Sequence, residues 1–167
     1  IDLLKSRIAG KPVTICGNAP TLSQELDAIS GVIIAADAAS GVLIRHGITP
    51  DVIVTDLDGI EDEAVTLNRK GTILVVHAHG DNIPRLRTWV PRMKGPLVLT
   101  TQGKPFGHVY NFGGFTDGDR AVYLAHEMQA SDVTLIGFDL DDPVVTPMKK
   151  GKLQWARKLL SLCGHEL

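Results

Sequence analysis

Short apolar runs rich in β-branched residues recur along this chain of 167 residues and alternate with segments of helical periodicity. This alternation limits the possible folds most, because strands that alternate with helices build a mainly parallel sheet with helices on both faces. The predicted strands are residues 13–16, 32–36, 52–54, 73–76, 97–99 and 133–136. The predicted helices are residues 22–29, 39–46, 61–69, 83–89, 120–129 and 153–160. We therefore predict a three-layer, Rossmann-like α/β fold.

Length and composition indicate one domain that spans residues 1–167. Hydrophobic residues make up 44% of the chain and charged residues 22%, which is ordinary for a globular protein. The net charge of -2, with scattered Lys and Arg, lacks the clustered basic excess of a nucleic-acid-binding protein. No apolar run approaches the roughly 20 residues that a membrane span needs. Since no signal peptide is visible either, we expect a cytoplasmic location and no membrane or nucleic-acid partner.

The first residue is Ile1 rather than methionine, and residues 2–8 look like the end of a helix. We expect a further N-terminal segment to precede this chain in the natural protein. Cys16 falls in a predicted apolar strand and Cys163 in the last predicted helix. Two such cysteines do not suggest a structural disulfide.

Two carboxylates, Asp56 and Asp58, follow the predicted strand at residues 52–54. Side chains at positions i and i+2 of an extended segment point to the same side, so both carboxylates would face one way. Ligands of open α/β sheets bind beyond the carboxyl ends of the strands, and Mg²⁺ is often held there by one or two carboxylates and substrate phosphates. The alternative is structural, with Asp56 as a helix cap and Asp58-Gly59 as a turn.

Polar or turn-forming residues also follow the other predicted strands, at the edge where this architecture places its site. Gly17 and Asn18 begin a small-residue turn that suits phosphate, although it lacks the Walker and full Rossmann patterns. Asp37 follows the second strand, and either a cap or a metal ligand would explain it. The segment after the fourth strand contains His77, His79, Asp81 and Asn82. Several carboxylates at equivalent strand ends favour Mg²⁺-nucleotide chemistry over zinc, for which no third nitrogen or sulfur ligand is spaced correctly.

A long glycine-rich loop with several aromatic residues interrupts the alternation at residues 102–119. We predict a functional loop with a short extra strand at residues 108–111. The later part of the loop, with the side chains of Asn111, Phe115, Thr116 and Asp117, is the candidate substrate-binding segment. An ordinary turn into the following helix is the alternative for residues 117–119.

Five segments together resemble the archaeal 6-hydroxymethyl-7,8-dihydropterin pyrophosphokinases. They are GNAP at 17–20, ADAA at 36–39, GITPDVIVTDLDG at 47–59, HAHGDN at 77–82 and GFTDGDRA at 114–121. That family is similar to thiamine pyrophosphokinases, whose Gly-Asp-x-Asp-Ser motif is echoed at residues 55–59 with Thr55 and Gly59 as departures. Ala38 also departs from the glycine that is usual in the family's Ala-Asp-Gly-Ala run.

The resemblance implies a fold similar to the catalytic domain of thiamine pyrophosphokinases. It also implies transfer of a diphosphoryl group from ATP to the hydroxymethyl group of a reduced pterin, with release of AMP and with Mg²⁺ as cofactor. The implied metal ligands are Asp37, Asp56, Asp58 and Asp81, of which the last three are the candidate catalytic residues. The implied ATP and phosphate contacts are Gly17, Asn18, Asp37, His79 and Asn82. Small molecules would be the partners, with a homodimer as a further expectation.

Three alternatives remain open at this point. A thiamine pyrophosphokinase would keep the chemistry and change the acceptor, but this chain ends in a helix rather than in the β-rich domain usual there. A non-catalytic nucleotide-binding module would use the same fold without the reaction. A sugar-nucleotide transferase would hold a metal-bound diphosphate at similar acidic strand ends.

Overall fold

The computed structural model describes residues 1–59 and 61–166, and it contains one seven-stranded sheet in which every pairing is parallel. The strand order is β6-β5-β4-β3-β2-β1-β7. The strands are β1 Pro12–Cys16, β2 Val32–Ala36, β3 Val52–Thr55, β4 Ile73–Ala78, β5 Leu97–Thr101, β6 Val109–Tyr110 and β7 Asp132–Ile136. All six predicted strands and the short extra strand in the long loop are thus confirmed, as is the α/β class.

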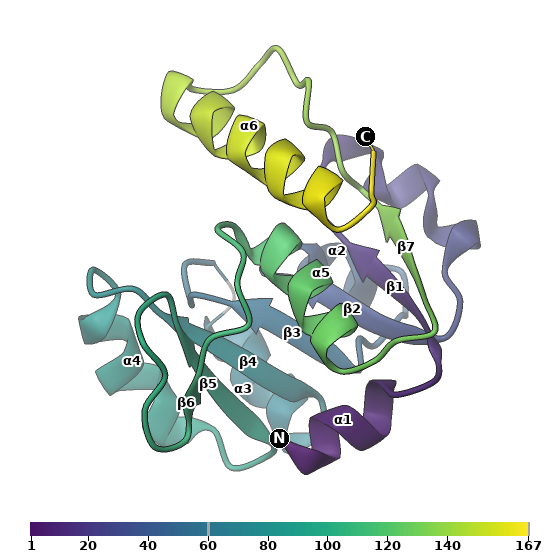
Figure 1. Cartoon of the computed structure of the whole chain (residues 1–167). Helices are drawn as coiled ribbons and strands as arrows, with labels where there is room; N and C mark the ends of the chain where they lie inside the picture. Colours follow the sequence, from purple (N-terminus) through teal and green to yellow (C-terminus); the bar gives the residue numbers. More distant parts are fainter. Residues whose placement is uncertain (60, 167) are drawn as a thin grey trace.

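Helices cover both faces of the sheet, which gives three layers (Figure 1). The helices α1 Asp2–Ile8, α5 Asp117–Glu127 and α6 Pro147–Leu162 pack with one face. The opposite face carries α2 Ala39–Arg45, α3 Glu61–Arg69, α4 Ile83–Trp89 and three 3₁₀ turns, η1 Pro20–Gln24, η2 Leu26–Ala28 and η3 Val90–Arg92. The strands between the layers are nearly continuous apolar runs, as expected for a parallel sheet buried on both sides. Among the described residues, no helix combines the length and apolar character that a membrane span requires.

The predicted helix at residues 22–29 was wrong, because this segment consists of the two 3₁₀ turns η1 and η2. Its apolar residues Leu22, Leu26 and Ile29 do face the core. Over eight residues, a period of 3.0 cannot be distinguished from one of 3.6, so the apolar pattern alone predicted the wrong helix type.

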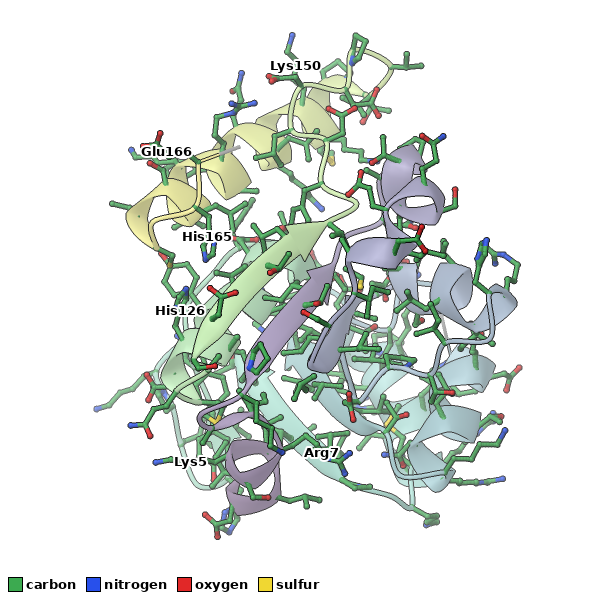
Figure 2. All side chains as sticks on the ribbon, turned by 90° about the vertical axis from the view of Figure 1, so that its right-hand side faces the viewer. Lys5, Arg7, His126, Lys150, His165 and Glu166 are labelled. Atoms are coloured by element: carbon green, nitrogen blue, oxygen red, sulfur yellow. The ribbon has the colours of Figure 1, made fainter. Side chains whose placement is uncertain are left out.

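Two helices begin earlier than predicted because their first turns are capped. Helix α5 begins at Asp117 rather than 120, and a capping box joins Thr116 to Asp119. Helix α6 begins at Pro147 rather than 153, after Thr146, whose hydroxyl accepts a hydrogen bond from the Lys149 N–H at 3.2 Å. The residues after α6 return to α5, where the Nε2 atoms of His126 and His165 lie 3.2 Å apart (Figure 2).

The chain direction changes at β1, which fixes where a ligand crevice opens. From β1 the sheet grows outward through β2 to β6, and the chain then returns through α5 to place β7 on the other side of β1. Such a reversal leaves a crevice beyond the carboxyl ends of β1 and β7, the two strands between which the order changes direction. Gly17 and Gly137 follow β1 and β7 directly, and a Cβ on Gly17 would lie 2.5 Å from the Gly137 carbonyl oxygen. Only glycine allows the two strand ends to approach this closely.

Candidate active site

Three aspartates gather at the carboxyl edge of the sheet. Asp37 follows β2, Asp56 follows β3 and Asp117 is the first residue of α5. Each offers one carboxylate oxygen, and these oxygens all lie within 4.8 Å of one another. We call these three residues the acidic triad. Its members come from segments that are far apart in sequence and that the parallel sheet brings together.

Local backbone geometry positions the triad. Asp37 adopts a left-handed conformation with φ of 44°, and its N–H donates to the Val54 carbonyl at 2.8 Å. The Thr55 hydroxyl donates to Asp37 Oδ1 at 2.6 Å. The second member, Asp56, lies 3.3 Å from His79 Nε2 through its Oδ2 atom. The carboxylates of Asp37 and Asp56 are therefore each contacted by a residue at the end of an adjacent strand.

Burial and mutual repulsion make the triad unfavourable for three negative charges. Burial raises the pKa of Asp117 well above its ordinary value, and the carboxylates of Asp56 and Asp37 raise it further. Burial also raises the pKa of Asp37, against the lowering effect of the hydrogen bond from Thr55. A divalent cation would remove the repulsion, and oxygen ligands of this kind fit Mg²⁺. The donor set thus fits the cation predicted from the sequence.

The expected extended geometry of Asp56-Leu57-Asp58 is wrong. Strand β3 ends at Thr55, and Leu57 turns into the left-handed region with φ of 67° and a fully buried side chain. Burial of the leucine reverses the chain, so the two carboxylates are not related as neighbours on a strand. The Asp58 N–H donates to Asp56 Oδ1 at 3.1 Å, and the Asp58 carboxylate pairs with Arg85 at 2.7 Å.

The residues after β4 have different positions in the structure. Asp81 is exposed, whereas Asn82 is 1% exposed. The Asn82 amide donates to the carbonyls of Asp56 at 2.9 Å and His77 at 2.7 Å, and its oxygen accepts from the His79 N–H at 3.1 Å. Asn82 therefore ties the end of β4 to the end of β3. Among the described residues, the acidic group near Asp37 and Asp56 includes neither Asp58 nor Asp81.

A cleft of about 500 Å³ opens beside the triad, above the ends of β1, β2 and β7. Asp37, Asp117, Gly17 and Asn18 line it. The Gly17 N–H is engaged by the Ile136 carbonyl at 2.8 Å, so its role there is the close approach described above rather than a free donor. The volume lies in the usual range for a small-molecule site.

Two lysines that the sequence did not suggest complete the cleft. Lys149 and Lys152 lie on α6 and line the side that faces the strand ends. Their spacing of three residues puts both on one face of the helix. Two ammonium groups in a cleft that also contains carboxylates of the triad suit a metal-bound polyphosphate. The sequence contained a faint signal, the lysine group at residues 149–152, which a solvated helix face explains equally well.

Several of the candidate binding residues in the long loop stabilise the loop itself or the helix that follows it. Asn111 donates to the Gly103 carbonyl at 2.9 Å and accepts from the Gly113 N–H at 3.0 Å, which fixes the loop itself. Phe115 is 47% exposed, and Thr116 caps α5. Only Asp117 of the four loop candidates joins the triad, and Thr116 and Asp117 also line the cleft.

Comparisons with known proteins identify the family of this chain. The family described as "6-hydroxymethylpterin diphosphokinase MptE-like" matches residues 1–144. Curated proteins with the name "6-hydroxymethyl-7,8-dihydropterin pyrophosphokinase" are similar to the chain. The one from Pyrococcus furiosus is 45% identical over 165 residues, with 89% of this chain and 70% of its own length covered.

Two further relatives with that name come from Methanothermobacter thermautotrophicus and Methanocaldococcus jannaschii. The first is 41% identical over 142 residues, with 77% of this chain and 61% of its own length covered. The second is 34% identical over 187 residues, with 96% of this chain and 78% of its own length covered. The chain thus spans only part of each relative. It belongs to the MptE-like 6-hydroxymethylpterin diphosphokinase family.

Proposed function

We propose that this member of the MptE-like family transfers the terminal diphosphoryl group of ATP to the hydroxymethyl group of 6-hydroxymethyl-7,8-dihydropterin and releases AMP. The observation that carries the proposal is the acidic triad beside a cleft of about 500 Å³ that Lys149 and Lys152 border. The names of the relatives support the same reaction. We also propose that residues 1–167 act as a single diphosphokinase domain. A cytoplasmic location and a possible homodimer stay predictions.

In this proposal the nucleotide lies in the cleft. Lys149 and Lys152 face its phosphates, while Asn18 lies at the turn after β1. Asp37, Asp56 and Asp117 would hold Mg²⁺ by their carboxylate oxygens. When bound, the cation would neutralise charge on the phosphate oxygens and help to align the reacting groups. Asp58 and Asp81 stay predictions as further metal ligands. In this proposal His79 and Asn82 hold Asp56 in place, His79 at the carboxylate and Asn82 at the backbone carbonyl.

The reaction forms one bond and breaks one bond at the β-phosphorus. The hydroxyl oxygen of the acceptor bonds to this phosphorus, and the bond from the phosphorus to the oxygen bridging the α- and β-phosphates breaks. AMP leaves with that oxygen, and the hydroxyl proton passes to a base or to solvent. Catalysis of this type depends on positioning and charge neutralisation. The chain's residues supply both by holding Asp37 and Asp56 at strand ends, by holding Asp117 at the start of α5 and by placing Lys149 and Lys152 in the cleft.

The identity of the leaving group tests the reaction. The protein is incubated with MgATP and either 6-hydroxymethyl-7,8-dihydropterin, thiamine or no acceptor, and AMP and ADP are separated and quantified. We expect AMP in proportion to the pterin consumed, and no AMP without an acceptor. ADP as the main product would exclude a diphosphokinase. AMP formation with thiamine but not with the pterin would show that thiamine is the acceptor.

A further inference from the structure

Arg120 is a buried cation without a direct partner. It lies in the first turn of α5 and is 9% exposed. Within residues 1–59 and 61–166, its guanidinium takes part in no side-chain hydrogen bond and in no ion pair within 4.0 Å, although Asp119, Asp117 and Asp56 lie close enough to raise its pKa against burial. The Asp119 carboxylate is occupied, because it accepts from the N–H groups of Phe115 and Thr116. The Arg120 nitrogens are not among the fully buried, unpartnered atoms of the described residues, so these donors remain accessible and free to bind a ligand.

Arg120 lines a different cavity from the nucleotide cleft. It lines a small cavity under α5 with Thr100, Thr101, Phe112 and Gly113, and it is not part of the cleft wall. This cavity is about 10 Å³, room for about one water molecule. The side chains of Val54, Val75 and Leu124 complete a largely apolar lining, in which Arg120 is the charged residue.

His77 lies close enough to Arg120 for the guanidinium to lower its pKa, and it has one unsatisfied polar atom. It is 2% exposed, its Nδ1 lies 3.0 Å from the Thr100 hydroxyl, and its Nε2 has no hydrogen-bond partner among the described residues. Its ring stacks on that of His79, with centroids 6.2 Å apart, and His79 in turn contacts Asp56. Buried polar atoms without partners are uncommon and mark places where a ligand or water belongs.

We propose that Arg120 recognises the acceptor by donating two parallel hydrogen bonds to a carbonyl oxygen and the adjacent ring nitrogen of a bicyclic amide. This inference rests on the proposed function and names the residue that selects its acceptor. The acceptor lies over the ends of β4 and β5, opposite the nucleotide, with the triad between the two substrates.

The chemistry of a reduced pterin matches this donor pair. Its C4 carbonyl oxygen and N5 are neighbouring acceptors, as are O6 and N7 of guanine, which arginine reads with a bidentate pair. The hydroxymethyl carbon is attached to C6, the atom next to N5. A guanidinium on the O4–N5 edge therefore places the reacting hydroxyl beside Arg120, on the side where Asp56 and Asp117 lie. Thiamine, which carries a positive ring, would meet repulsion from the same guanidinium.

The loop over Arg120 must shift to admit the ring, because the present cavity holds only a water molecule. Gly113 and Gly114 are both in the left-handed region, with φ of 96° and 86°. A Cβ on Gly114 would lie 2.7 Å from Cα and Cγ of Arg120, so the glycine pair is packed directly on the arginine. This pair provides the backbone freedom for the shift.

Two acceptors that differ only at C4 test the assignment. The full chain is assayed for AMP release with the 7,8-dihydro forms of 6-hydroxymethylpterin and of 2,4-diamino-6-hydroxymethylpteridine, in which an amino group replaces the carbonyl. Wild type should prefer the 4-oxo compound by roughly 5- to 150-fold in kcat/KM, the range of bidentate arginine pairs on base edges. Arg120→Gln should lose most of this preference and keep the KM for ATP. The matched control is Arg87→Gln, on the exposed side of α4, which should behave as wild type.

Equal use of both acceptors by wild type overturns the inference, even where Arg120→Gln fails to fold. A preference that survives in Arg120→Gln overturns it as well, as does an equal rise in the KM of both substrates. Direct binding of the fluorescent 4-oxo compound, measured without ATP, separates the two proposals. Tight binding that needs Arg120 but gives no AMP refutes the proposed reaction and supports the recognition. AMP formation with Arg120-independent binding does the reverse.

Discussion

The hydroxyl of Thr55 donates a hydrogen bond of 2.6 Å to Oδ1 of Asp37 and thereby joins the ends of the neighbouring strands β3 and β2. The same hydroxyl accepts a hydrogen bond from the Leu57 N–H at 2.8 Å. Since a hydroxyl has only one proton, this contact directs the proton toward Asp37 and favours the ionised carboxylate. Thr55 is thus a positioning residue for the triad.

Removal of this hydroxyl should weaken metal binding. Thr55→Val keeps the shape but not the donor, and we expect the Mg²⁺ concentration for half-maximal activity to rise by roughly 10- to 100-fold, as for other residues that orient metal ligands. Thr55→Ser should restore most of the loss. Titration of AMP formation against Mg²⁺ measures the effect. An unchanged Mg²⁺ dependence in Thr55→Val would show that the hydroxyl only supports the turn at Leu57.

A second prediction separates function from stability at Asp117. Asp117→Asn should reduce kcat by at least about 100-fold, since it removes a carboxylate from the charge-neutralising site. The same change should raise the melting temperature of the metal-free protein, because it relieves burial of a carboxylate beside Asp37 and Asp56. Thermal unfolding in EDTA and AMP release in Mg²⁺ measure the two effects.

Asp81→Asn is the comparison for Asp117→Asn. It should leave the melting temperature unchanged, because Asp81 is exposed. A loss of activity as large as that of Asp117→Asn would extend the metal site to the end of β4. A lower melting temperature for Asp117→Asn in EDTA would instead contradict the repulsion argued for the triad.

The lysines of α6 provide a third prediction. Lys149→Gln and Lys152→Gln should each raise the KM for ATP several-fold and change that for the acceptor little, because both side chains line the nucleotide cleft. Lys150 lies between them on the same helix, is exposed and is not part of the cleft wall (Figure 2). Lys150→Gln is therefore the matched control for the change in net charge. Equal effects of all three substitutions would show that α6 attracts ATP only through its overall positive charge and not through specific contacts of Lys149 and Lys152.

The strands were predictable because each is a short apolar run bounded by polar residues, and the parallel order follows from their alternation with helices. The position of Asp37 and Asp56 at adjacent strand ends was predictable for the same reason. The geometry around Asp58 was not, since it depends on burial of Leu57 against the opposite helical layer. No local sequence pattern indicates that a leucine adopts a positive φ so that its side chain can reach the core.

The role of Asp117 could not be read from the loop pattern either. The sequence placed it in a glycine-rich loop, where an acceptor contact and a helix cap explain it equally well. Its position in the triad depends on the return of the chain through α5, which crosses the sheet from β6 to β7. Arg120 was missed because an arginine in the first turn of a helix is usually solvated. Only the packed structure shows that this one is buried.

The final prediction concerns His77 and the acid side of the stability profile. The pKa of His77 is lowered to about 4, first by burial and then by the positive charge of Arg120 and by His79. An unfolded histidine titrates near its ordinary value of about 6.5. Between these values the unfolded chain binds a proton that the folded protein does not. Stability from this residue is therefore complete above about pH 6.5 and is lost as the pH falls toward 4, by roughly 3 kcal/mol in all.

Urea unfolding of the metal-free protein at several pH values between 7 and 4.5 measures this contribution. His77→Gln cannot be protonated, so its unfolding free energy should fall less steeply with decreasing pH than that of wild type, whatever its stability at pH 7. His108→Gln, in the exposed part of the long loop, is the control and should keep the wild-type slope. Parallel pH profiles for wild type and His77→Gln would mean that His77 is protonated in the folded state, with an anion or water at Nε2. Because His77 lies close enough to Arg120 for the guanidinium to lower its pKa, such a result would also place an unseen hydrogen-bond acceptor near Arg120.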